Sequence, residues 1–137
     1  MNYLIDTNIC IYLMNRRPSE LLYKLVSKFK QMDLGQIAIS SITVAELQFG
    51  VAKSINKTKN QLRLDEFLFP FTILPFTQWH TTHYGRLRAS LAQKGQVIGS
   101  LDMLIAAHAL AENRILVTNN DKEFVRVEGL SVENWLY

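Results

Sequence analysis

Four acidic residues stand where a sheet protein could gather them into one site. Asp6 follows an apolar segment at the start of the chain, Glu46 lies in a predicted helix after a second apolar segment, Asp102 opens an apolar helix, and Asp121 follows a later strand. Right-handed crossovers bring the carboxyl ends of parallel strands to one edge of a sheet, so these acids can converge there. Clustered carboxylates repel one another, and such a group usually binds a cation. Oxygen ligands favour Mg²⁺ or Mn²⁺ over zinc.

Each acid also has a purely structural interpretation. Asp6 can cap the helix that follows it. Glu46 lies three residues after Thr43, which is the spacing of a capping box. Asp102 can complement the dipole of its helix, and Asp121 can be a turn residue. For any one of these residues taken alone, the structural role carries about as much weight as the catalytic role.

The elements that must position these acids alternate between strands and helices. Apolar runs predict strands at 4–5, 37–39 and 115–117, a last short strand within 130–135, and an edge strand at 73–74 between two prolines. Helical periodicity predicts helices at 9–14, 19–29, 42–53, 79–94 and 101–112. The polar stretch 56–63 has no such pattern, and the apolar stretch from Leu64 to Phe71 is expected to be helical until Pro70. This alternation predicts an α/β fold, a three-layer α/β/α sandwich around a mainly parallel sheet.

Composition sets further limits. The 137 residues fit a single domain over 1–137, and the only cysteine, Cys10, reads as a small core residue and allows no disulfide within the chain. There is no apolar run long enough for a membrane span and no secretory signal pattern. We therefore expect a soluble, cytoplasmic protein without a membrane partner. The net charge of +3 and the pI near 9.1 are too mild to identify a polyanionic partner.

Four segments carry a resemblance to a known family. They are Leu-Ile-Asp-Thr-Asn around Asp6, Ser-Ser-Ile-Thr-Val-Ala-Glu-Leu-Gln-Phe-Gly around Glu46, Asp-Met-Leu-Ile-Ala-Ala-His-Ala from Asp102, and Leu-Val-Thr-Asn-Asn through Thr118, followed by Glu123-Phe. Together they resemble a PIN-domain ribonuclease. The closing segment Val-Glu-Gly-Leu-Ser-Val-Glu-Asn-Trp is similar to the VapC toxins of bacterial toxin–antitoxin pairs. The match covers the whole chain in order.

The resemblance implies a fold, a function and partners. It makes Asp6, Glu46 and Asp102 the metal-binding catalytic acids of a Mg²⁺-dependent endoribonuclease, with Mn²⁺ as a possible substitute. It implies a structured RNA substrate, with tRNA expected, a cognate VapB-type antitoxin that silences the enzyme, and a homodimer. Water activated by a metal ion would leave a 5′-phosphate and a 3′-hydroxyl.

The fourth acid of the family pattern is an open question in this sequence. Many PIN domains carry an acid two residues after the position of Thr118, and here that residue is Asn120. Asp121 is the nearest acid and could stand in for it. Alternatively, Thr118 and Asn120 hold a water molecule beside the metal.

Other signals are weaker. His80 and His83 have a helical spacing that zinc can use, but no third ligand is near in sequence, and His108 reads as a hydrogen-bonded core histidine. Some of the scattered basic residues must flank the acids if RNA binds there: Arg16, Arg17, Lys53, Lys57, Lys59, Arg63, Arg86, Arg88 and Lys94. Two other functions stay open: a nuclease or phosphatase acting on another substrate such as DNA, and a non-catalytic binding module whose acids are only caps.

Overall fold

The computed structural model describes residues 1–15 and 18–136; Arg16 and Arg17, two of the scattered basic residues, fall outside this part of the chain. The elements follow in the order β1 (Tyr3–Ile5), α1 (Thr7–Asn15), α2 (Glu20–Lys30), the short 3₁₀ turn η1 (Leu34–Gln36), β2 (Ile37–Ser40), α3 (Ser41–Ala52), α4 (Lys57–Leu68), β3 (Thr72–Leu74), α5 (Gln78–Gln93), α6 (Ser100–Ala111), β4 (Ile115–Val117), α7 (Asp121–Phe124) and β5 (Val132–Glu133).

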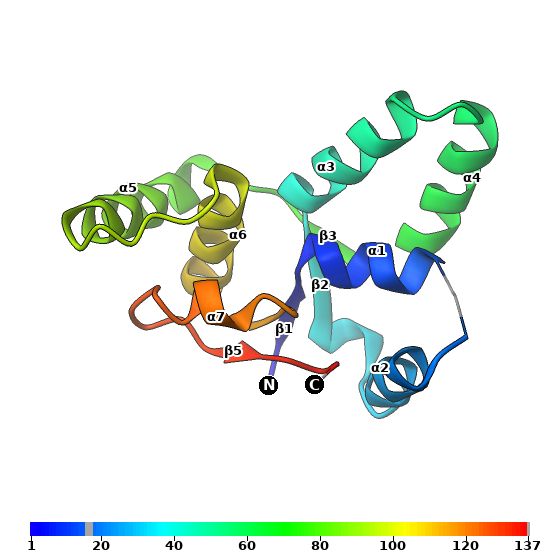
Figure 1. Ribbon diagram of the computed structural model, residues 1–137, viewed down its shortest axis with the longest axis horizontal. Helices are drawn as coiled ribbons and strands as arrows, with labels where there is room; N and C mark the ends of the chain where they lie inside the picture. The colour runs from blue at the N-terminus through cyan, green and yellow to red at the C-terminus, as the bar shows by residue number, and fades with distance from the viewer. Residues whose placement is uncertain (16–17, 137) are drawn as a thin grey trace.

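The strands form one five-stranded sheet in the order β3-β2-β1-β4-β5 (Figure 1). Every neighbouring pair is parallel, so the carboxyl ends of all strands share one edge. The sequence prediction of a mainly parallel sheet is confirmed. The segment 73–74 does form an edge strand, where bracketing prolines cost few ladder hydrogen bonds.

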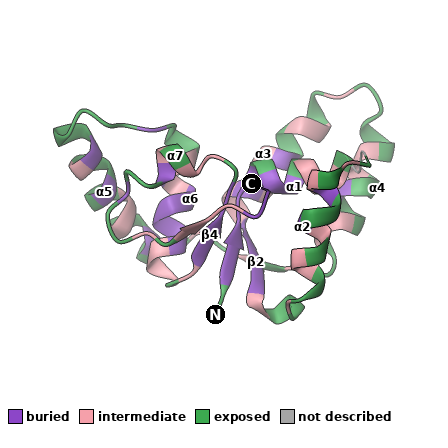
Figure 2. Cartoon of the chain, turned by 60° about the horizontal axis from the view of Figure 1, so that its bottom comes forward, coloured by how far each residue is buried: buried purple, intermediate pink, exposed green. Residues whose placement is uncertain are grey.

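Side chains of the sheet alternate between two helical layers. Tyr3 and Ile5 pack in a hydrophobic cluster with side chains from α1, α2 and α4, and this cluster includes the predicted core residue Cys10. Leu4 faces the opposite way and packs with side chains from α5 and α6. The three central strands β1, β2 and β4 are therefore buried on both faces between helices (Figure 2), as covered parallel strands are, whereas the edge strands β3 and β5 are partly exposed. The three-layer α/β/α architecture is confirmed.

Two helices differ from the sequence prediction. Helix α4 begins at Lys57, so the polar stretch 56–63 is its first two turns and not a loop. Only Leu64 in this helix is fully buried, which explains why no apolar period marks the earlier turns. Helix α7 has four residues and is too short for a periodic pattern to reveal it. In the described part of the chain, no helix has the length and apolar character needed to cross a membrane.

Candidate active site

Asp6 lies immediately after the central strand β1 and is 2% exposed. Its Oδ1 accepts a hydrogen bond of 2.8 Å from the Thr7 backbone N–H, and its Oδ2 accepts one of 2.7 Å from the Thr118 hydroxyl. Burial raises the pKa of Asp6 from 3.8 to about 6; the two hydrogen bonds lower it in part, and the charges of Asp102 and Glu46 raise it further. Asp6 also precedes helix α1, so it holds a helix-start position as well as the centre of an acidic cluster.

Glu46 reaches the same edge of the sheet from helix α3. Its Oε1 accepts a hydrogen bond of 2.8 Å from the Thr7 hydroxyl, and the hydroxyl oxygens of Thr7 and Thr43 are 3.0 Å apart. The capping-box interpretation of Glu46 is wrong. The N-cap of α3 is Ser40, whose hydroxyl oxygen accepts the Ile42 N–H at 3.0 Å, and Thr43 lies inside the helix. Glu46 is therefore held across the cluster by α1 and is free of a capping role.

Asp102 lies in the first turn of α6, the apolar helix packed against α5. Its pKa is raised, first by burial, then by the charge of Glu123 and then by that of Glu46. A Cβ atom at Gly99 would come within 3.1 Å of the Asp102 Oδ2 atom. The absence of a side chain at Gly99 therefore allows the Asp102 carboxylate to lie close to the backbone at the start of α6.

Glu123 is a fourth acid of the cluster and is not among the four acids expected from the sequence to converge there. It stands on α7, and its charge is the strongest of those that raise the pKa of Asp102. The Asn120 side-chain N–H donates to Glu123 Oε2 at 3.0 Å, while the Asn120 backbone N–H donates to the Thr118 hydroxyl oxygen at 3.0 Å. Thr118 and Asn120 thus bind carboxylates directly. The signal available in the sequence was the Glu123-Phe pair in the last family motif.

Asp121 is placed differently. Its Oδ1 accepts a hydrogen bond of 3.2 Å from the Asn134 side chain, at the start of α7. Its charge is not among those that shift the pKa of Asp6 or Asp102. The structure brings Glu123, and not Asp121, next to the other acids.

The electrostatics of this cluster favour a bound cation. Four carboxylates converge, and within residues 1–15 and 18–136 none of them forms an ion pair with a lysine or arginine. Burial and mutual repulsion raise the pKa values of Asp6 and Asp102, so the ionised form of the cluster is costly without a cation. A divalent cation coordinated by oxygen would remove this cost. The donor set fits Mg²⁺ or Mn²⁺.

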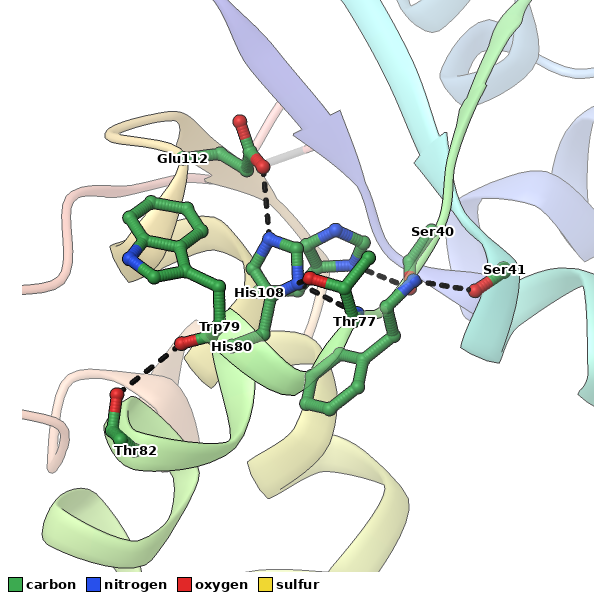
Figure 3. Close-up of polar contacts among 9 residues, drawn as sticks. Ser40, Ser41, Thr77, Trp79, His80, Thr82, His108 and Glu112 are labelled. Carbon is green, nitrogen blue, oxygen red and sulfur yellow. Dashed lines mark hydrogen bonds and ion pairs between the residues drawn. The ribbon is translucent and has the colours of Figure 1, made fainter.

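The histidines form a separate cluster between α5 and α6 (Figure 3). His80 pairs with Glu112 through a 2.8 Å contact from Nε2 to Oε1, and its ring centroid lies 4.3 Å from that of His108. The His108 Nδ1 atom lies 2.8 Å from the Ser40 hydroxyl oxygen, which confirms His108 as a hydrogen-bonded core histidine. Burial, with the charge of His80 next, lowers the pKa of His108 to about 4, so its ring is neutral near pH 7.

Ligand atoms of His80, His108 and Glu112 lie within 4.8 Å of one another, but the protonation of His80 opposes a metal site there. Its Nδ1 accepts the Thr77 backbone N–H at 2.8 Å, so the neutral ring carries its proton on Nε2 and donates it to Glu112. Coordination through Nε2 would move the proton to Nδ1, where it would meet the Thr77 N–H. The cluster is a hydrogen-bonded link between helices, and it does not use His83 as the zinc hypothesis supposed.

Comparisons with known proteins find a matching family model and similar chains of known structure. The sequence profile of the PIN domain matches residues 3–130. The chain is 50% identical over 135 residues to a protein named ribonuclease VapC2 from Rickettsia felis, covering 98% of both chains. It is 36% identical to the tRNA(fMet)-specific endonuclease VapC of Shigella flexneri, again over 98% of both. The crystal structure of VapBC2 from Rickettsia felis, bound to a DNA fragment from its promoter, contains a similar chain: TM-score 0.87 and 48% identity, covering 98% of this chain and 99% of that one.

Proposed function

The chain belongs to the PIN-domain family, and from that premise we propose that it is a metal-dependent endoribonuclease toxin that cuts structured RNA, with tRNA as the expected substrate. PIN-domain ribonucleases depend on metal ions. The observation that supports the proposal most is the convergence of buried and half-buried carboxylates without a cationic partner in the described residues. Relatives named as VapC ribonucleases supply the substrate class.

We assign the catalytic and metal-binding roles to Asp6, Glu46 and Asp102, with Glu123 as the fourth acid. Thr118 would position Asp6, because its hydroxyl donates to Oδ2. Asn120 would position Glu123 by donating from its side-chain amide. Asp121, hydrogen-bonded to Asn134, would lie outside the catalytic group.

Each group of the chain has a distinct task in the hydrolysis. The acids of the cluster would hold a Mg²⁺ or Mn²⁺ ion, which would supply a water of lowered pKa and stabilisation of negative charge at the attacked phosphate. Asp6, buried and fixed by two hydrogen bonds, gives the cluster a rigid centre at the end of β1. Glu46 on α3 and Asp102 on α6 would contribute further metal ligands, and the Thr7 hydroxyl fixes Glu46 by donating a hydrogen bond to its carboxylate. Neither His80 nor His108 is assigned the role of base, because His80 is hydrogen-bonded to Glu112 and His108 to Ser40.

The partners follow from the relatives. A similar chain is present in the VapBC2 complex of Rickettsia felis, so we propose that a VapB-type antitoxin binds this protein and silences it. We also propose a homodimer, as is common in the family. Expression of the protein alone should then arrest growth, and co-expression of the small protein encoded beside it should restore growth.

The test compares wild type with Asp102→Asn on tRNA, on other RNA and on DNA of matched length. Wild type should cut tRNA with Mg²⁺ or Mn²⁺ and stop in excess EDTA, while Asp102→Asn should be inactive yet folded by circular dichroism. The exposed substitution Asp65→Asn on α4 is the matched control and should cut like wild type. Cutting of DNA alone would redirect the proposal to the nuclease alternative, and no cutting of any nucleic acid would favour a binding module.

A further inference from the structure

A cavity of about 250 Å³ lies between α5 and the segment that follows α7, away from the acidic cluster. His83, Arg86 and Ser90 line it from α5, and Arg126 lines it from the segment after α7. Its apolar wall includes the buried side chains of Leu87 and Val127. Hydrogen-bond donors from two separate parts of the chain therefore border one open cavity with an apolar backing, and the side chains of Arg86 and Arg126 are exposed at its rim. We call it the α5 cavity.

The charge in this cavity is not neutralised by the protein. Within the described residues, neither the Arg86 nor the Arg126 guanidinium has a hydrogen bond or an ion pair. The one acid in the lining, Glu128, has a side chain that is 88% exposed and lies 3.9 Å from the Lys94 ammonium group. The two arginines thus leave an uncompensated positive potential at the cavity.

The imidazole of His83 adds a third donor, and its surroundings favour one tautomer of the ring. Its Nδ1 atom is buried without a hydrogen-bond partner in the described residues, and its ring packs edge-on against Trp79 at a centroid distance of 5.5 Å. A buried N–H without an acceptor is costlier than a buried lone pair. The neutral ring therefore keeps its proton on Nε2, where it can be donated to a ligand.

We infer that the α5 cavity binds a phosphate group of the substrate RNA. Guanidinium groups match phosphate oxygens as paired donors, and a hydroxyl and an imidazole complete a donor set with almost no acceptors. This inference rests on the proposed function and adds an RNA contact that lies outside the catalytic acids. Asp102 and Leu110, which borders the cavity, are at opposite ends of α6 and are separated by about 12 Å along the helix axis. The contact therefore positions RNA and takes no part in bond cleavage.

The binding experiment uses the Asp102→Asn protein with Mg²⁺, and the tRNA is checked on a gel after each titration to confirm that it is intact. The double substitution Arg86→Gln/Arg126→Gln in this background should weaken tRNA binding by at least about tenfold at about 150 mM salt, and reduce the slope of log K against log salt by about one. The control is Arg88→Gln, which removes one positive charge from α5, as Arg86→Gln does, at a side chain that contacts Tyr84 instead of the cavity. It should change binding by less than about threefold. Equal losses in the double variant and the control, or no loss in either, would overturn the inference while leaving RNA cleavage by wild type intact.

A second experiment needs neither RNA nor catalysis. Inorganic phosphate titrated into wild type should shift the imidazole NMR signals of His83, which a His83→Gln variant assigns, and should leave those of His108 in place. The Arg86→Gln/Arg126→Gln protein should show no such shift. A His83 signal that does not respond to phosphate would refute the site. Sedimentation of the double variant tests whether a second copy of the chain occupies the cavity instead. If the two substitutions convert a dimer to a monomer, the α5 cavity is an interface between copies, and the phosphate site is also refuted.

Discussion

The raised pKa of Asp6 predicts that Asp6→Asn stabilises the metal-free protein while removing its function. The increase from 3.8 to about 6 corresponds to about 3 kcal/mol of lost stability at neutral pH, since one step in pKa is worth about 1.4 kcal/mol. The asparagine keeps the carbonyl oxygen that accepts the Thr7 N–H, but its amide group meets the Thr118 hydroxyl where a carboxylate oxygen was. Loss of that hydrogen bond costs about 1 kcal/mol. The net expectation is a gain of about 2 kcal/mol in the free energy of unfolding.

The sign of the pH dependence follows from the same shift. The folded protein holds the Asp6 proton more tightly than the unfolded chain, so wild type loses stability as pH rises from about 4 to about 6. The advantage of Asp6→Asn should therefore be about 2 kcal/mol at about pH 7.5 and close to zero at about pH 4.5. Urea unfolding of both proteins in EDTA at the two pH values measures it. The exposed control Asp65→Asn should stay within about 0.5 kcal/mol of wild type at both.

Metal ions complete this test. Mg²⁺ at about ten times its Kd should stabilise wild type by about 1.4 kcal/mol and Asp6→Asn by much less. The reasoning would be refuted by an Asp6→Asn protein that is less stable than wild type at both pH values and responds equally to Mg²⁺. In that case Asp6 would serve α1 as a cap and would not be the buried acid of a metal site.

Two further predictions concern the surroundings of the cluster. Gly99→Ala should lower the rate of RNA cleavage with little change in melting temperature, because the new Cβ would displace the Asp102 carboxylate. The control is Gly85→Ala in the middle of α5, whose Cβ would meet no atom within 4 Å; it should leave the rate unchanged and stabilise the protein by about 0.5–1 kcal/mol. Equal cleavage rates for the two variants would contradict the close approach of Gly99 to Asp102. Glu123→Gln should weaken the Mg²⁺ dependence of cleavage and Asp121→Asn should not, as measured by the Mg²⁺ concentration at half-maximal rate, and the reverse result would restore Asp121 to the fourth position.

Much of the fold is readable in the sequence because the central strands of the sheet are buried on both faces. A uniformly apolar segment such as Ile115–Val117 predicts a strand covered on both faces, and the apolar sequence of α6 predicts a buried helix. Both predictions depend only on local sequence. The polar start of α4 could not be read in the same way. Its early turns are mostly exposed, and the side chains that reach the core, Leu64, Phe67 and Leu68, all lie in its second half.

The candidate site was predictable in part for a different reason. Asp6 and Asp102 follow directly from their places after β1 and at the start of α6. Glu123 depends on a four-residue helix that turns it back toward Asp102, and no local pattern fixes that turn. Likewise, the contact between His80 and His108 depends on how α5 packs against α6, and no local sequence pattern specifies that packing.

The chemistry of the cut ends tests the central claim most directly. Purified wild-type protein is incubated with tRNA and Mg²⁺, and the termini of the fragments are identified by enzymatic end-labelling and mass spectrometry, with parallel reactions in excess EDTA and with Asp102→Asn. Hydrolysis at the acidic cluster predicts fragments with 5′-phosphate and 3′-hydroxyl ends, absent from both parallel reactions. Fragments with 2′,3′-cyclic phosphate ends, formed equally well in EDTA, would contradict it.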